Sequence, residues 1–281
     1  MEKGGLGGVI AGSGFTFKKK FGQNFITDSE LLDEIVDGAG VDKQTTVIEI
    51  GCGAGTLTRA IAGKAKYVYG YEIDTSLKPV LARTLSGVDN AEIIFKDFTR
   101  VRIDEIEKTL PPYRVVANLP YYITTPLIMQ LVENSKKCLS LTVMVQEEVA
   151  LRLCAKCGTP DYGAITANVA LRGECRLIKK VGREKFTPSP NVDSAVVRID
   201  LCEKRLDVND AELYKKVVRA AFSSRRKTLE NNLLNAFGLD RTAAREIITG
   251  CGFPEGVRGE ALSPEEFAVL SNAIGGQLKR G

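Results

Sequence analysis

The stretch TVIEIGCGAG, residues 46–55, decides the fold class of this chain. Residues 46–50 are β-branched apart from one glutamate, and three of them are apolar, which predicts a buried strand. The glycines that follow at alternate positions let the backbone turn tightly and leave no side chain between main chain and ligand. A helix is predicted directly afterwards, over residues 56–65. This succession predicts an α/β fold with a small-molecule site at the strand tip, although glycine-rich strand ends also occur for structural reasons.

Strands and helices alternate on both sides of this stretch. The expected strands are 67–73, 93–95, 114–117 and 139–145, and the expected helices are 29–36, 76–85, 126–132 and 147–153. The first of these helices opens at a Thr-Asp-Ser sequence that is suited to capping. Such alternation predicts a parallel sheet with helices on both faces.

The pattern changes after residue 164. Three further strands are predicted without long helices between them, as antiparallel additions at the sheet edge: 167–171, 175–181 and 195–201. Only helical spacing follows, over 214–222, 226–237, 241–249 and 264–274, with turns at Gly238, Gly252 and Ser263. We therefore expect one domain over residues 1–204 and a small helical domain over 205–281.

The composition is that of a soluble globular protein. The 281 residues are 44% hydrophobic and 26% charged, and no apolar run is long enough to cross a bilayer. The glycine-rich start, residues 4–8, lacks the features of an export signal and reads as a loose tail. Seven cysteines without such a signal indicate reduced thiols, so we expect a cytoplasmic protein.

The absence of histidine limits the chemistry that is available. Cys154 and Cys157 form a C-x-x-C pair, but a zinc site needs two more ligands, so we expect no metal. The commonest general base is missing as well, so catalysis must proceed without an imidazole.

The net charge of +4 is modest, but the basic residues are clustered. The clusters are Lys18–Lys20, Lys179–Lys185 and Arg225–Lys227. Any one of them is compatible with solvated surface. Together they suit the phosphate backbone of a nucleic acid.

Two carboxylates end the next strands of the predicted sheet. Glu72 lies where a carboxylate binds both ribose hydroxyls of a nucleoside, and Asp97 lies where it accepts from an adenine amino group, with Phe98 beside the ring. The third glycine of a dinucleotide motif would fall at Thr56, so a ligand with a pyrophosphate is disfavoured. These carboxylates are compatible with ordinary strand-end charges, but their concurrence with the glycine loop favours S-adenosyl-L-methionine.

The residues 118–122, Asn-Leu-Pro-Tyr-Tyr, follow the apolar strand 114–117. We expect the Asn118 side-chain oxygen and the Leu119 carbonyl to accept both hydrogens of a nucleobase amino group, with Pro120 stiffening the turn. Tyr121 offers a ring for stacking on the base, and simple core filling is the alternative for it. We expect Tyr122 to pack in the core behind the loop.

Four motifs together resemble one family. They are Phe21–Phe25, the glycine loop, residues 118–122, and Phe186–Ser194, and they resemble the ribosomal RNA adenine N6,N6-dimethyltransferases. The stretch Ala221–Leu229 is similar to the bacterial small-subunit branch. The resemblance implies a Rossmann-like class I methyltransferase sheet, mostly parallel with an antiparallel edge, plus a small all-α domain that binds RNA.

The resemblance also implies roles for individual residues. Tyr121 and Phe186 match an aromatic pair that sandwiches the target adenine, and Ile26 stands where leucine is usual. With the residues argued above, the expected cofactor site comprises Asn24, Ile26, Gly51, Gly53, Gly55, Glu72, Asp97, Phe98 and Asn118. The expected catalytic residues are Asn118, Leu119, Pro120, Tyr121 and Phe186.

The implied activity is dimethylation of two adjacent adenosines in the 3′-terminal hairpin of small-subunit ribosomal RNA, with S-adenosyl-L-methionine as cofactor. The implied partners are this RNA and the pre-30S particle, and we expect a monomer. Two alternatives stay open: an assembly factor that acts mainly by binding RNA, and a large-subunit RNA methyltransferase of the macrolide-resistance type. A DNA adenine methyltransferase is disfavoured because its motif usually begins with Asp where this chain has Asn118.

Overall fold

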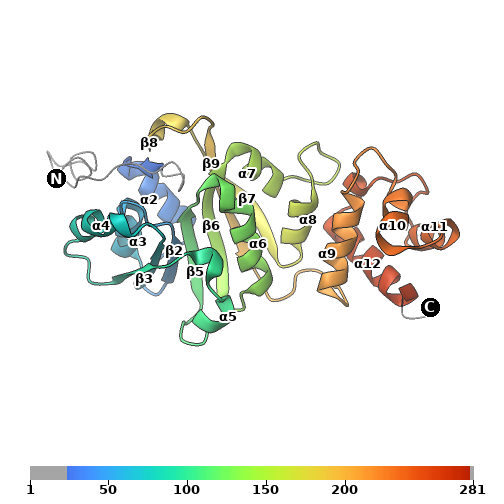
Figure 1. Ribbon diagram of the computed structural model, residues 1–281, viewed down its shortest axis with the longest axis horizontal. Helices are drawn as coiled ribbons and strands as arrows, with labels where there is room; N and C mark the ends of the chain where they lie inside the picture. Colours follow the sequence, from blue (N-terminus) through green and yellow to red (C-terminus); the bar gives the residue numbers. More distant parts are fainter. Residues whose placement is uncertain (1–23, 279–281) are drawn as a thin grey trace. The chain divides into compact units, whose positions relative to one another are not determined.

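The computed structural model describes residues 24–278 (Figure 1). The glycine-rich start, the cluster Lys18–Lys20 and the first residues of the motif at 21–25 lie outside the described residues. Contacts divide the described residues into two compact units, one formed by residues 24–150 with 175–201 and the other by 151–174 with 202–278.

Among the described residues, seven strands form the main sheet of the first unit. In spatial order they are β4 (Ala91–Phe95), β3 (Tyr67–Glu72), β2 (Thr46–Ile50), β5 (Tyr113–Asn118), β6 (Cys138–Gln146), β9 (Ser194–Leu201) and β7 (Gly173–Val181). The pairs from β4 to β6 are parallel, and β9 runs antiparallel to β6. The predicted parallel sheet with an antiparallel edge is therefore confirmed.

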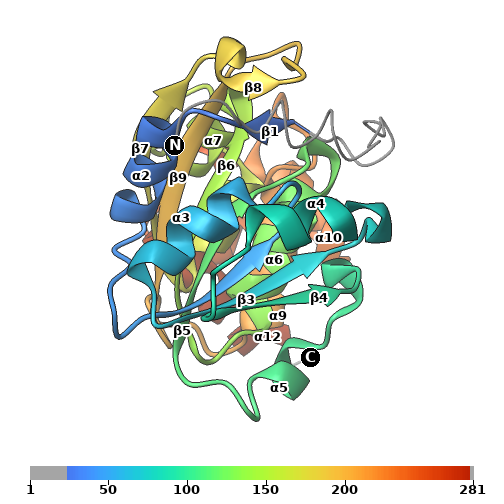
Figure 2. The ribbon, with the colours of Figure 1, turned by 90° about the vertical axis from the view of Figure 1, so that its left-hand side faces the viewer.

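Helices cover both faces of this sheet. Figure 1 shows α2 (Ser29–Gly38), α3 (Thr56–Lys64) and α4 (Lys78–Thr84) on one side of the strands and α6 (Thr124–Asn134) on the other, and Figure 2 views the first group from the front. The strand residues beneath them, such as Val47 and Val116, are fully buried.

The order of the strands determines where a ligand can bind. The chain runs outward from β2 to β3 and β4 and then crosses back to β5, on the other side of β2, so the strand order reverses at β2. Helices that diverge from such a point leave a crevice at the carboxyl ends of the strands. Because β2, β3 and β5 are parallel, their carboxyl ends meet at one edge.

Several short elements complete the described structure. A two-stranded antiparallel sheet that was not predicted joins β1 (Phe25–Ile26) to β8 (Phe186–Thr187). The remaining helices of the first unit are α5 (Ile103–Ile106), η2 (Thr75–Leu77), η3 (Phe98–Arg100), η4 (Tyr121–Ile123) and η5 (Arg183–Lys185). The division between the units falls within α7 (Glu147–Leu153).

One predicted strand is wrong, because residues 164–170 form helix α8. Its buried residues, Thr166, Ala167, Val169 and Ala170, recur at the spacing of a helix. The Tyr214 hydroxyl donates to the Ala167 carbonyl at 2.9 Å, which ties α8 to the helices that follow in the chain. This packing explains why residues 151–174 group with the second unit, whereas a single boundary at 204/205 was expected.

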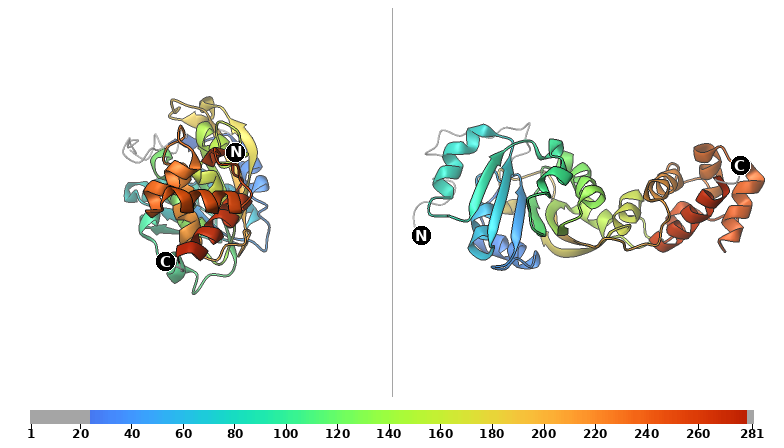
Figure 3. Two further views of the ribbon diagram at one scale, coloured as in Figure 1. Left: turned by 90° about the vertical axis from the view of Figure 1, so that its right-hand side faces the viewer. Right: turned by 90° about the horizontal axis from the view of Figure 1, so that it is seen from below.

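The predicted helical succession of the second unit is confirmed. Its later helices are α9 (Ala211–Ala221), α10 (Leu229–Phe237), α11 (Arg241–Gly250), η6 (Gly259–Ala261) and α12 (Pro264–Leu278), which Figure 3 shows packed against one another. α10 begins three residues later than expected because the Thr228 hydroxyl caps it by accepting from the Asn231 N–H. Within the described part of the chain, no helix is both long and apolar enough to cross a membrane.

Candidate active site

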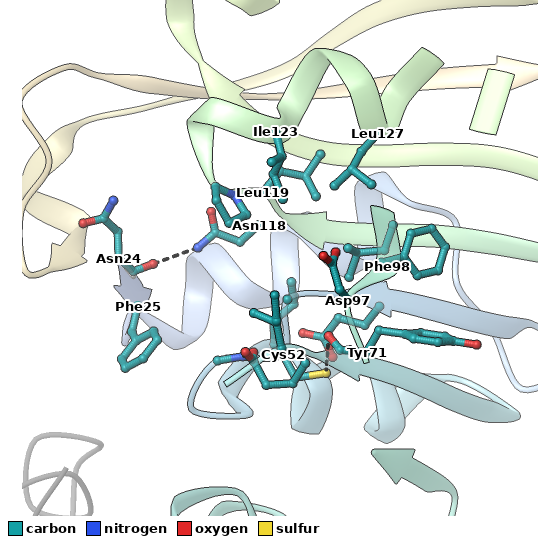
Figure 4. Close-up of a pocket in the computed structure, with 18 of the residues that line it drawn as sticks. Asn24, Phe25, Cys52, Tyr71, Asp97, Phe98, Asn118, Leu119, Ile123 and Leu127 are labelled. Atoms are coloured by element: carbon teal, nitrogen blue, oxygen red, sulfur yellow. Dashed lines mark hydrogen bonds between the residues drawn. The ribbon is translucent and has the colours of Figure 1, made fainter. Parts of the chain in front are cut away.

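A cavity of about 290 Å³ opens at the carboxyl ends of β2, β3 and β5 (Figure 4). This volume lies near the lower end of the range for small-molecule sites, roughly 300–1,000 Å³. The structure brings most of the predicted site residues together in its wall, namely Asn24, Ile26, Gly51, Gly53, Glu72, Asp97, Phe98, Asn118, Leu119, Pro120 and Tyr121.

The glycine loop forms the floor of the cavity. Gly53 has φ +54°, a left-handed conformation that strains any residue with a Cβ atom. A Cβ at this position would also lie 2.8 Å from Cε1 of Phe25. The Gly53 N–H donates to Oε2 of Glu72 at 2.8 Å, so the loop and the tip of β3 hold each other in place.

Glu72 is a buried carboxylate held by backbone donors. Its Oε1 accepts from the Asp74 N–H at 2.7 Å, and its Oε2 accepts from Gly53. Burial raises the pKa of Glu72, and these N–H groups offset part of the rise by stabilising the charged form. Each carboxylate oxygen has a further acceptor position, which suits a pair of ribose hydroxyls.

Asp97 and Phe98 lie at the start of η3, after the end of β4. The Asp97 side chain caps this turn by accepting from the Thr99 N–H at 3.0 Å and from the Thr99 hydroxyl at 2.7 Å, both through Oδ1. The ring of Phe98 is buried and packs edge-on against Tyr71, with the ring centroids 4.9 Å apart. The position of Asp97 is thus set by local capping through Oδ1. Its other oxygen, Oδ2, remains available on the side of the cavity and lies 3.6 Å from Nε of Arg100.

The segment Asn24–Ile26 closes one side of the cavity through three attachments. The Asn118 side-chain amide donates from Nδ2 to the Asn24 carbonyl at 2.9 Å (Figure 4). The Thr56 hydroxyl donates to the Ile26 carbonyl at 2.9 Å, and β1 pairs with β8. Ile26 thus contributes its backbone, so the change from the usual leucine leaves this contact intact.

The Asn118 contact orients the amide at the tip of β5. Because Nδ2 points to Asn24, Oδ1 points the other way, and it has no hydrogen-bond donor among residues 24–278. The next residue, Leu119, is buried and donates its N–H to the Met144 carbonyl at 3.3 Å, which fixes the backbone of the tip to β6. The tip therefore presents an amide oxygen on a rigid support.

The two tyrosines of the tip point in different directions. The Tyr121 hydroxyl shares a hydrogen bond of 2.8 Å with the Ser194 hydroxyl, and burial raises its pKa, so the phenol stays neutral. Tyr122 is 62% exposed and lines the cavity, so its expected place in the core was wrong. The reason is the single turn η4, in which successive side chains are rotated by about 120°.

Two predicted site residues do not line the cavity. Phe186 is only 4% exposed, pairs with Ile26 in the β1–β8 sheet and packs in the core. Gly55 begins α3 with φ +83°, and a Cβ there would lie 2.9 Å from Cδ2 of Leu81. Both residues therefore support the wall of the cavity from behind.

The residues that the sequence reading did not assign to the site are mainly apolar. They include Phe25, Tyr71, Ile73, Ile123 and Leu127. Ile73 lines the cavity and is 46% exposed. Its position in the sequence, directly after the strand-end carboxylate Glu72, could have indicated that it belongs to the site. The exposed Lys96, directly before Asp97, also lines the cavity.

The arrangement fits S-adenosyl-L-methionine. The glycine floor leaves space that a Cβ would fill, and the acceptor positions of Glu72 face the same cavity as Asp97. Asn118 at the end of β5 and Tyr121 in η4 line the same cavity.

Substitution of Gly53 by Ala tests the glycine floor. The added Cβ strains the left-handed backbone and presses on Phe25, so we expect S-adenosyl-L-methionine to bind about tenfold more weakly or worse. The measurement is isothermal titration calorimetry. Gly63→Ala is the matched control because its added Cβ would lie within 4 Å of no atom beyond its chain neighbours and the backbone of its own helix, and its affinity should stay at the wild-type value. Equal affinity of both variants would contradict a contribution of the glycine loop to cofactor binding.

Known proteins of similar sequence extend over nearly the whole chain. The ribosomal RNA small subunit methyltransferase A of Clostridioides difficile is 43% identical over 270 residues, which cover 95% of this chain and 93% of that protein. The protein of the same name from Bacillus licheniformis is 45% identical, over 93% of this chain and 92% of its own length.

Solved structures show the same fold. The 23S rRNA methyltransferase ErmE superposes with a TM-score of 0.70 at 27% identity, over 90% of this chain and 100% of that chain. A dimethyladenosine transferase from Plasmodium falciparum gives a TM-score of 0.76 at 25% identity, over 88% and 95%. The expected methyltransferase sheet is confirmed.

The family model described as ribosomal RNA adenine dimethylase matches residues 14–269. A match of this extent covers both the cavity and the helices of the second unit. The chain is thus a methyltransferase with S-adenosyl-L-methionine as its cofactor, and it belongs to the ribosomal RNA adenine dimethylase family.

Proposed function

We propose that this protein transfers methyl groups from S-adenosyl-L-methionine to the N6 atoms of two adjacent adenosines in the 3′-terminal hairpin of small-subunit ribosomal RNA. Two kinds of observation support the proposal. The relatives that share 43–45% of the sequence carry the name of a small-subunit RNA methyltransferase. The observation that carries the chemistry is the Asn118 amide, whose nitrogen is engaged and whose oxygen is left as an acceptor.

The mechanism depends on alignment of the adenine amino group. That nitrogen is a poor nucleophile because its lone pair is delocalised into the ring. The Asn118 Oδ1 atom and the Leu119 carbonyl accept its two hydrogens and turn the lone pair out of the ring plane. The cofactor supplies an electrophilic methyl group on a sulfonium. Positioning of this kind contributes several orders of magnitude in rate, and the proton leaves N6 after transfer, without an imidazole base.

The target base must leave its stack to reach this tip. Stacking on an aromatic ring stabilises a flipped base by about 1–3 kcal/mol. Tyr121 lines the cavity next to Asn118, and Tyr122 adds an exposed ring at the same place. The sandwich that the sequence suggested between Tyr121 and Phe186 has less support, because Phe186 is buried in the core.

The basic loop Arg225–Lys227 of the second unit suits RNA. Arg226 and Lys227 are exposed, and their side chains make no ion pair or hydrogen bond within the described residues. Arg225 instead donates to the Pro160 and Tyr162 carbonyls, at 3.0 and 2.9 Å, and so fixes the loop.

The cluster Lys179–Lys185 is less available to RNA. Three of its lysines pair with carboxylates of the first unit, namely Lys179 with Glu34, Lys180 with Glu147 and Lys185 with Asp28. We therefore assign the main phosphate contacts to Arg226 and Lys227, and propose that the helical unit binds RNA. The pre-30S particle is the proposed partner, and a cytoplasmic monomer is the proposed form.

The substrate is tested by methyl transfer from labelled cofactor. We expect incorporation into small subunits that lack the modification, approaching four methyl groups per particle because two adenosines each accept two. Large-subunit RNA should accept none. Mapping of the modified nucleotides checks the hairpin. Transfer to large-subunit RNA alone would favour an enzyme of the macrolide-resistance type; among the similar structures, ErmE is named as a 23S rRNA methyltransferase. RNA binding without any transfer would favour the assembly factor.

The role of Asn118 is tested by Asn118→Ala. Loss of the amide oxygen removes one acceptor that orients the amino group, so we expect the single-turnover rate to fall about 100-fold or more while RNA affinity stays the same. Asn118→Asp keeps an acceptor oxygen but loses the donor to the Asn24 carbonyl. The segment Asn24–Ile26 is then held less firmly over the cavity, so cofactor binding should weaken as well. A rate near the wild-type value in Asn118→Ala would refute the positioning account.

The basic loop is tested by the salt dependence of RNA binding. Arg226→Ala should weaken binding and lower the slope of log Kd against log salt by about one, as expected for one lost phosphate contact. Arg226→Lys keeps the charge and should keep the slope. Arg225→Ala should mainly lower the melting temperature, because it removes two contacts to main-chain carbonyls. An unchanged slope in Arg226→Ala would place the RNA elsewhere.

A further inference from the structure

Glu49 is a buried carboxyl that the mechanism above does not use. It lies one residue before the end of β2, is 0% exposed, and belongs to the wall of the cavity. Neither of its oxygens accepts a hydrogen bond of standard geometry within the described residues, although the Thr58 and Cys52 side chains lie near enough to lower its pKa. Buried polar atoms without partners are rare in folded proteins, so this position calls for a physical explanation.

The surroundings of Glu49 disfavour a negative charge. Burial raises its pKa to about 8, the neighbouring Thr58 and Cys52 side chains offset part of the rise, and the charge of Glu72 adds to it. β5 contributes no charged group beside it, because its partner there is Val116. No cationic side chain is among the groups that act on this carboxyl. At neutral pH Glu49 therefore holds a proton.

We propose that Glu49 lets the cavity distinguish the cationic cofactor from its neutral product, by ionising when S-adenosyl-L-methionine binds and remaining protonated with S-adenosylhomocysteine. This inference rests on the cofactor assignment and on the methyl transfer of the proposed function. The step breaks only the O–H bond of the Glu49 carboxyl, and its proton passes to solvent when the cofactor enters.

The charge difference follows from the reaction. Transfer of the methyl group turns the sulfonium into an uncharged thioether, so the product carries one positive charge less than the cofactor. Two carboxyls on neighbouring strands, Glu49 and Glu72, repel each other when both are ionised. A cation in the cavity relieves that repulsion, and its loss restores it. Glu49 then takes up a proton again, and the product lacks the charge contact that held the cofactor.

The proton count can be measured with the wild-type protein. Titration calorimetry at pH 7 in buffers of different ionisation enthalpy gives the number of protons released per ligand. With a pKa of about 8 in the free protein, we expect S-adenosyl-L-methionine to release roughly nine-tenths of a proton, and S-adenosylhomocysteine close to none. Since the chain contains no histidine, no imidazole contributes to this count.

The sign of the pH dependence is also defined. A ligand that binds the ionised form better gains affinity as the pH rises and levels off above the pKa of the free protein. The preference for S-adenosyl-L-methionine over S-adenosylhomocysteine should therefore grow about fivefold between pH 7 and pH 8, roughly a further twofold by pH 9, and little beyond.

Two variants make the assignment specific to Glu49. Glu49→Gln should abolish the difference in proton release between the two ligands, while any proton change of a ligand itself persists. Thr58→Val removes a hydroxyl that lowers the pKa of Glu49, so the pH of half-release should move upward. Thr58→Val keeps the inference testable if Glu49→Gln does not fold, as judged by its thermal transition.

The outcomes separate this inference from the proposed function. Binding and methylation by the wild type without proton release would overturn the inference alone. The same proton release in Glu49→Gln as in the wild type would also overturn it. Failure of the wild type to bind S-adenosyl-L-methionine at all would instead overturn the cofactor assignment on which both depend.

Discussion

The hydrogen bond from the Asn118 amide to the Asn24 carbonyl is the contact on which the geometry of the site depends. An amide has a donor end and an acceptor end, so holding its nitrogen determines where its oxygen points. The same bond joins the tip of β5 to the segment Asn24–Ile26, which Thr56 and β8 also hold. One contact thus determines the direction of the amide oxygen at the tip of β5 and holds one wall of the cavity.

The parallel sheet provides the support for this contact. Because β2, β3 and β5 run the same way, the glycine loop, Glu72 and Asn118 emerge at one edge although the sequence separates them by up to 67 residues. The bond from the Gly53 N–H to Glu72 joins two of these tips directly. The result is a cavity that is polar at defined points and apolar between them.

Local sequence patterns were sufficient for most of the fold. The strand and glycine loop at residues 46–55 were predicted because β-branched periodicity and alternating glycines have few alternative structures. The prediction of a strand over residues 167–171 is wrong because a short apolar run fits a strand or a helix equally well. Contact with Tyr214, distant in sequence, is part of what settles that choice.

The sequence by itself determined the α/β class, the placement of Glu72, Asp97 and Asn118 at strand ends, and the family resemblance, because each of these depends on residue type and order. Only the tertiary structure decided which way those groups face. It turned Tyr122 outward, buried Phe186 and left the oxygens of Glu49 without partners. Side-chain direction at a strand tip depends on neighbours from distant segments, and no local pattern encodes those neighbours.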